Sequence, residues 1–68
     1  MKLIMKTEFD NLRTNDNHCY DSDSNGEKTV VRIYCGERLI AKKLTLKKSV
    51  RYFGIHGYQK YLTQDIED

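Results

Sequence analysis

The dipeptide Asn25-Gly26 constrains the fold of this chain more than any other feature. It follows the polar run Asp21-Ser22-Asp23-Ser24 and precedes the β-branched and aromatic run Thr29–Cys35. Asn-Gly is the strongest two-residue signal for a β-hairpin, because both central residues of a type I′ turn need a positive φ. The sequence therefore predicts two antiparallel strands joined at residues 25–26.

A second hairpin signal follows the first. Gly36-Glu37 separates the run that ends at Cys35 from the apolar and basic run Arg38–Leu46. Gly suits the first central position of a type II′ turn. Together the two signals predict a three-stranded meander over residues 18–46, with Tyr20 opposite Val31 in a register set by two-residue loops.

This register divides the predicted sheet into two faces. The expected core face comprises Tyr20, Val31, Ile33, Cys35, Ile40 and Leu44. The other face mixes apolar and basic side chains and comprises Cys19, Val30, Arg32, Tyr34, Leu39, Ala41 and Lys43. Because Cys19 and Cys35 fall on opposite faces, we predict no disulfide between them.

Residues 46–64 show a helical spacing. Apolar or small residues recur at intervals of three or four, which is one stripe of an α-helix: Leu46, Val50, Phe53, Gly57 and Tyr61. We therefore predict a helix over 46–64. Gly54 and Gly57 each cost ~1 kcal/mol relative to Ala inside a helix, so a break at residues 54–57 is the alternative.

Residues 1–14 are ambiguous. Leu3-Ile4-Met5 is typical of the start of a strand, whereas Phe9 and Leu12 follow Met5 at the spacing of a short helix capped by Thr7. A chain of 68 residues has room for one hydrophobic core. We predict a single α+β domain over residues 1–68, with a small antiparallel sheet of three to four strands and one C-terminal helix packed on one face.

Charge is segregated along the chain, although the formal net charge is only +2. Residues 28–60 hold nine basic residues against Glu37 alone, a net charge of +8, while residues 1–27 and 61–68 carry −3 each. Segments of opposite charge can pair with each other within the molecule, or they can give the protein two opposite surfaces to offer to partners.

Basic and aromatic residues interleave in the positive segment, and Tyr and Arg are enriched in binding hot spots. The predicted partner-binding residues are Lys42, Lys43, Lys47, Lys48, Arg51, Tyr52 and Tyr58. We expect Tyr52 and Tyr58 to be exposed, because both fall off the helical stripe. A second candidate is an acidic surface, whose carboxylates imitate phosphates, made of Asp16, Asp21, Asp23 and Glu27.

Metal and catalytic motifs are weak. Residues 21–26 match the first half of an EF-hand loop, but the position that needs a bidentate carboxylate is Arg32. The His and Cys residues lack the short paired spacing of zinc sites. No phosphate-binding loop or nucleophile elbow is present. We predict no metal, no cofactor and no enzymatic activity.

Targeting segments are not evident either. No stretch approaches the ~20 apolar residues of a membrane span or resembles a secretion signal. We therefore expect a cytoplasmic protein with free thiols and no membrane partner.

Part of the chain resembles a DNA-binding family. The run Thr29 to Tyr34, then Gly36-Glu37-Arg38 and then Leu44 to Ser49 is similar to the strand–turn–strand passage of the arm-type DNA-binding domains of phage integrases and of plant AP2-like domains. The resemblance implies a domain that binds DNA with the basic face of its sheet.

In size, polarity and strong charge the chain also resembles the small stand-alone inhibitors of phages and other mobile elements, including anti-CRISPR proteins. That resemblance implies a non-enzymatic protein that inhibits nucleic-acid-handling machinery, either host defence or a polymerase complex, by docking on it. The implied partner is a protein or ribonucleoprotein complex of the host, with nucleic acid as the alternative. We expect a monomer or a homodimer.

Overall fold

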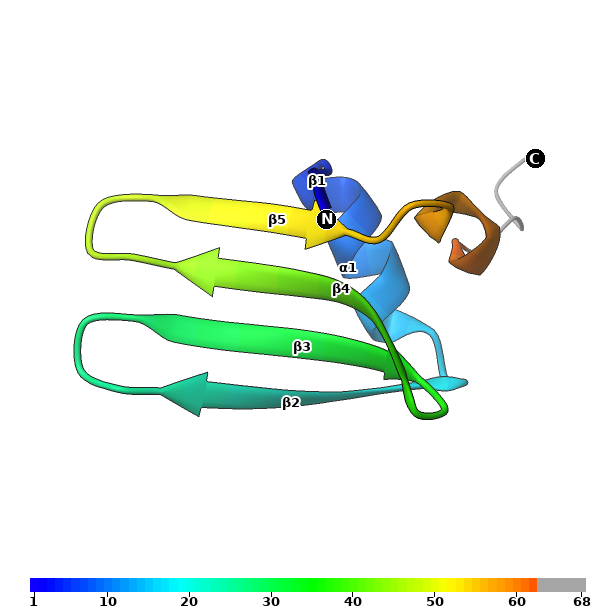
Figure 1. The fold of residues 1–68 in the computed structure, drawn as a ribbon, viewed down its shortest axis with the longest axis horizontal. Coiled ribbons are helices and arrows are strands. Elements are labelled where there is room, and N and C mark those ends of the chain that lie inside the picture. The colour runs from blue at the N-terminus through cyan, green and yellow to red at the C-terminus, as the bar shows by residue number, and fades with distance from the viewer. Residues whose placement is uncertain (63–68) are drawn as a thin grey trace.

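A computed structural model describes residues 1–62 as a five-stranded antiparallel sheet with one α-helix (Figure 1). The strand order is β1-β5-β4-β3-β2. The elements are β1 (Lys2–Leu3), α1 (Lys6–Thr14), β2 (His18–Ser24), β3 (Thr29–Cys35), β4 (Arg38–Thr45), β5 (Val50–Gly54) and the 3-10 helix η1 (Tyr58–Tyr61). The class is α+β, but the predicted sheet of three to four strands with a C-terminal helix is wrong, because the α-helix precedes the meander.

Residues 1–14, which the sequence predicts as either a strand or a short helix, form first a strand and then a helix. The short strand β1 pairs with the end of β5, and α1 follows. Phe9 and Leu12, whose spacing predicted a helix, are fully buried. The helix begins one residue before the predicted cap Thr7. At its start the backbone N–H of Met5 donates to Oε1 of Glu8 (3.0 Å), which satisfies a backbone donor that the helix leaves unpaired.

The hairpin around Asn25-Gly26 forms, but with a longer turn than predicted. The turn comprises residues 25–28, and the backbone N–H of Asn25 donates to the carbonyl of Lys28 (3.0 Å). Gly26 has a φ of 82°, whereas no residue other than Gly has a positive φ among those described. The predicted type I′ turn, which needs a positive φ at Asn25 as well, is therefore wrong.

The longer turn shifts the register between β2 and β3 by two residues. Tyr20 faces Ile33 instead of Val31. Because side chains alternate between the faces of a strand, a shift of two residues leaves each side chain on the same face. Cys19 and Cys35 lie on opposite faces of the sheet, and both are free thiols.

A β-bulge changes which side chains of β4 meet the core. The two-residue turn between β3 and β4 pairs Tyr34 with Leu39 in the expected register, but the next pair is Ile33 with Ala41. Ile40 is therefore the extra residue of the bulge. It is fully buried, and the alternation of β4 is inverted beyond it.

The inversion corrects three predicted positions. Ala41 and Lys43 lie on the same face as the core residue Ile33, and Leu44 lies on the opposite face, whereas the sequence predicted the reverse. The carbonyl of Ile40 accepts a hydrogen bond from the backbone N–H of Ile55 (3.1 Å). This hydrogen bond satisfies the carbonyl group of the bulged residue and links the bulge to the segment that follows β5.

The predicted helix over residues 46–64 is wrong. Residues 46–49 form a turn, which the N–H of Leu46 closes by donating to the carbonyl of Ser49 (2.8 Å), and β5 follows. The β-branched and aromatic residues of β5 suit a strand. The alternative break at residues 54–57 is closer to the structure, because Gly57 has a φ of 83° and, as far as residue 62, the helical part of the chain after it is the 3-10 helix η1. Residues 63–64 of the predicted helix lie outside the described residues.

The core lies on one face of the sheet, which we call the helix face. Its buried hydrophobic residues are Phe9, Leu12, Ile33, Ile40, Ala41 and Tyr58. The helix α1 crosses the sheet near one end, with η1 beside it (Figure 1). The other end of the sheet, which carries turns 25–28 and 46–49, extends beyond α1, and the molecule measures 40 × 24 × 19 Å.

Gly54 permits the close approach of η1 to the sheet. A Cβ atom at this position would lie 3.0 Å from Cγ of Tyr58 and 3.1 Å from Cγ2 of Ile4. The Tyr58 ring is thus packed against bare backbone, and any larger residue would have to displace it.

We expect Gly54→Ala to lower the free energy of unfolding by about 1–3 kcal/mol, the usual cost of overpacking a core. Urea denaturation of the variant and the parent protein measures this difference. Gln59→Ala, at an exposed position of η1, is the control and should change the midpoint little. Equal midpoints for the two variants would contradict the close packing of Tyr58 on Gly54.

Candidate functional site

Several of the predicted basic residues gather at one end of the sheet, which we call the basic tip. It consists of turns 25–28 and 46–49, which lie side by side, and the start of β5 (Figure 1). Its basic side chains are all exposed: Lys28, Lys47, Lys48 and Arg51. Within residues 1–62 none of them forms an ion pair. Two apolar side chains lie among them, Leu46 at 39% and Val50 at 45% exposed.

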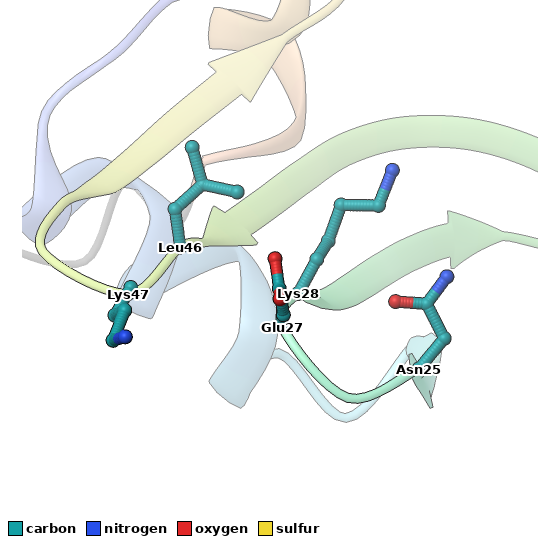
Figure 2. Close-up of a pocket in the computed structure, with 5 residues that line it drawn as sticks. All are labelled: Asn25, Glu27, Lys28, Leu46 and Lys47. Carbon is teal, nitrogen blue, oxygen red and sulfur yellow. The ribbon is translucent and has the colours of Figure 1, made fainter.

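A hollow of about 590 Å³ lies between the two turns of the basic tip. Figure 2 shows its lining, with Glu27 and Lys28 between Leu46 on one side and Asn25 on the other. The hollow is open to solvent and mixes one carboxylate with Lys and Leu side chains. It is suited to receive a side chain of a docking partner rather than to enclose a substrate.

Lys42 and Lys43, which the sequence assigned to one binding surface, lie on opposite faces of β4. The ammonium group of Lys42 lies 5.9 Å from the ring centroid of Phe53, on the face away from α1. The ammonium group of Lys43 lies 5.9 Å from the ring centroid of Tyr52, on the helix face. One flat partner surface cannot contact both.

The two predicted binding tyrosines belong to the interior. Tyr52 is half-buried, and its ring centroid lies 5.4 Å from that of the core residue Phe9. Tyr58 is only 5% exposed. The expectation that both are exposed is therefore wrong. It depended on a helical stripe that does not exist, because β5 and η1 replace the helix.

Tyr58 is held by a hydrogen bond across the fold. Its hydroxyl donates to Oε2 of Glu8 (2.8 Å), while Oε1 of the same carboxylate accepts from the N–H of Met5. This hydrogen bond raises the pKa of Tyr58 above its ordinary value of 10.0, and burial and the carboxylate charge act in the same direction. Glu8 thus joins the start of α1 to η1.

The predicted acidic residues are divided between the two ends of the molecule. Asp21 and Asp23 lie on β2, and Glu27 is in the turn that follows, whereas Asp16 lies in the loop between α1 and β2. All are exposed. Asp21 pairs with Arg32 of the neighbouring strand at 3.4 Å, so only part of this acidic surface is free of a counter-charge.

The sheet face away from α1, which we call the open face, has no helix packed over it among the described residues (Figure 1). The strand registers assign to it Cys19, Asp21, Asp23, Val30, Arg32, Tyr34, Leu39, Lys42, Leu44, Arg51 and Phe53. Half-buried apolar side chains lie on β3, β4 and β5, with the half-buried basic residues Arg32 and Lys42 between them. Acidic side chains lie on the β2 side, and basic side chains lie on β3, β4 and β5.

Sequence reasoning missed a groove of about 450 Å³ on the helix face. One wall is α1 and the other is the sheet, and the lining residues are Lys6, Phe9, Asp10, Arg13, Tyr20, Ser22, Val31 and Lys43. Arg13 lies 5.8 Å from the ring centroid of Tyr20, and Lys6 pairs with Asp10 at 2.9 Å. The helical spacing of Lys6, Asp10 and Arg13 was the available signal, but only the fold brings β2 beside them.

Within residues 1–62 no group of three or more His, Cys, Asp or Glu side chains is arranged to hold a metal ion. In the same part of the chain no helix is long and apolar enough to cross a membrane. Comparison with known proteins finds no matching family model, no similar curated protein and no similar solved structure. The function must therefore be argued from the surfaces described above.

We expect the stability of the protein to fall above about pH 10. The pKa of Tyr58 is higher in the folded state than in the unfolded state, so its contribution is complete below pH 10 and is lost as the pH rises through the folded value. The hydrogen bond to Asp10 raises the pKa of Lys6 as well and adds in the same direction. Thermal melts from pH 7 to pH 11 measure the effect.

Tyr58→Phe isolates the hydroxyl. The variant should melt at a lower temperature than the parent at pH 7. Between pH 9 and pH 11 it should lose less stability than the parent, because only the part of the loss that is due to Lys6 remains. Tyr34→Phe, which removes a hydroxyl from the open face, is the matched control. It should lose as much stability at alkaline pH as the parent does. Parallel pH profiles for the parent and Tyr58→Phe would contradict the role of the Glu8 contact.

Proposed function

We propose that this chain is a non-enzymatic binding protein that docks on a protein partner through the basic tip and the adjoining open face. The observation that carries the proposal is the pair of exposed apolar side chains, Leu46 and Val50, among cations that have no ion-pair partner in residues 1–62. Protein interfaces combine an apolar centre with a polar rim. Half-buried Leu44 and Phe53 add apolar side chains on the open face, whereas the strand register places Val50 on the helix-face side of β5.

The charge pattern favours a protein over a nucleic acid as the partner. Asp21, Asp23 and Glu27 lie on or beside the same surface, and they would repel a phosphate backbone that covered it. A protein can place acidic groups against the basic tip and basic groups against β2. Complementary charges of this kind speed association and fix the orientation of docking.

We propose further that the partner belongs to the host machinery that handles nucleic acids and that docking inhibits it. Two features support this class of target. Proteins of that machinery carry basic surfaces for phosphates, which the carboxylates of Asp21 and Asp23 complement. The size, polarity and charge of the chain resemble those of small inhibitors of mobile elements. Inhibition would occur by occlusion, and the expected cytoplasmic location suits such a target.

DNA binding is the second candidate. Arg32 pairs with Lys42 across adjacent strands of the open face, and Arg51 lies on the same face of β5. A sheet that presents basic side chains in this way can enter the major groove of a duplex. The acidic β2 side is the argument against it.

The triple variant Lys47→Glu, Lys48→Glu, Arg51→Glu tests the basic tip. We expect it to keep the melting temperature of the parent within a few degrees, because all three side chains are exposed and lack ion pairs among residues 1–62. It should lose the partner, since like charges at a contact reduce both steering and affinity. Capture from host lysate on immobilised parent and variant, compared by quantitative mass spectrometry, measures the loss.

A matched variant reverses two basic residues away from the tip, Lys2→Glu and Lys60→Glu, and it should capture the same partner as the parent. Equal capture by the tip variant would contradict this assignment. Electrophoretic mobility shift with mixed duplex DNA at two salt concentrations tests the second candidate. Tight, salt-sensitive binding by the parent, lost in the tip variant, would replace the protein partner by DNA.

A further inference from the structure

Strand β2 is a free edge of the sheet. Within residues 1–62 only β3 pairs with it, and six of its seven residues are exposed. Natural proteins protect such edges with Pro, charged side chains (Lys above all), bulges or very short strands. β2 has neither Pro nor Lys, and its register with β3 is continuous.

Two hydrogen bonds fix which backbone groups of β2 point away from the sheet. The N–H of Asn25 donates to Lys28 across the hairpin, whereas the N–H of His18 donates to Asn15 and not to β3. Bonded and non-bonded positions alternate along an antiparallel pair. The residues of β2 whose N–H and C=O groups face the free side are therefore Tyr20, Ser22 and Ser24.

The side chains of β2 exclude one obvious occupant, a second copy of the same strand. Antiparallel self-pairing with full overlap is centred on Asp21, which then lies directly opposite the Asp21 of the other copy. Like charges directly opposite each other destabilise a strand pair. The acidic side chains therefore oppose homodimer formation through this edge.

The same acidic side chains select a basic strand. Asp21 and Asp23 lie on the open face, two residues apart, which is about 7 Å along a strand. Alternate residues of an added strand have the same spacing. Asp23 has no ion pair among residues 1–62, and Asp21 has a single one at 3.4 Å, so both can accept a further cation.

We propose that β2 accepts an added strand from a partner protein, an extended segment with Lys or Arg at alternate positions opposite Asp21 and Asp23. The backbone of the added strand pairs with the free N–H and C=O groups of Tyr20, Ser22 and Ser24, and this pairing supplies affinity. The basic side chains of the added strand supply selectivity. This site lies at the edge of the sheet opposite β1. It does not depend on the basic tip, and the tip variant should retain it.

A nuclear magnetic resonance titration with the peptide Thr-Lys-Val-Lys-Val-Lys-Thr, capped at both ends, tests the proposal. Strand addition should shift the amide resonances of Tyr20, Ser22 and Ser24 more than those of Cys19, Asp21 and Asp23, and it should slow their hydrogen exchange. The peptide with Glu in place of Lys should bind at least about fivefold more weakly. Equal affinity for the two peptides, or shifts without the alternation, would overturn the proposal.

Variants separate strand addition from simple charge attraction. Ser22→Pro removes an N–H that faces the free side, a position where an edge strand tolerates Pro, and it should abolish binding while Ser22→Thr retains it. Asp23→Lys should cancel the preference for the Lys peptide over the Glu peptide, because the new cation opposes the effect of Asp21, and this result stands even if Ser22→Pro does not fold. Unchanged binding by a folded Ser22→Pro, or an unchanged preference in Asp23→Lys, would overturn the proposal.

Discussion

The packing of Phe9 and Leu12 on one face of the sheet is the interaction on which the rest of the structure depends. They are the fully buried apolar side chains of α1, a helix of nine residues, and they cover the sheet only where the helix crosses it. Because this cover is small, the sheet itself must be amphipathic. One face meets α1, and the open face and the basic tip remain in water with mixed charge. The surfaces available for binding thus follow from the shortness of the helix.

Local signals predicted the parts of the fold that local chemistry determines. Asn25-Gly26 and Gly36 indicated two hairpins, and the spacing of Phe9 and Leu12 indicated a helix. The bulge at Ile40 could not be predicted, because an apolar residue there suits either register and only the contact of its carbonyl with Ile55 distinguishes them. β5 was mistaken for helix because a strand of five residues gives a weaker signal than a longer helical spacing. Its pairing with β1, which is distant in the chain, leaves no local signal in the sequence.

For the candidate site, too, the sequence predicted what local structure determines and not what long-range contacts determine. Lys47 and Lys48 stay together because neighbours in a tight turn cannot separate, whether that turn begins a helix or joins two strands. Lys42 and Lys43 separate because strand residues alternate between faces. Tyr58 lies in the core and not at the surface as expected, because its position depends on Gly54 and on Glu8, which is fifty residues away in the chain.

That last contact has a consequence for how the protein is made. β1 pairs with β5, and the carboxylate that begins α1 binds a hydroxyl of η1, so the N-terminal elements gain their partners only from the C-terminal part of the chain. Non-local contacts of this kind slow folding. A nascent chain that ends before Tyr58 holds the central hairpins without their finished core. Translation must pass this residue before the native state is reached, and until then the unfinished core is exposed to other chains, in addition to the edge of β2.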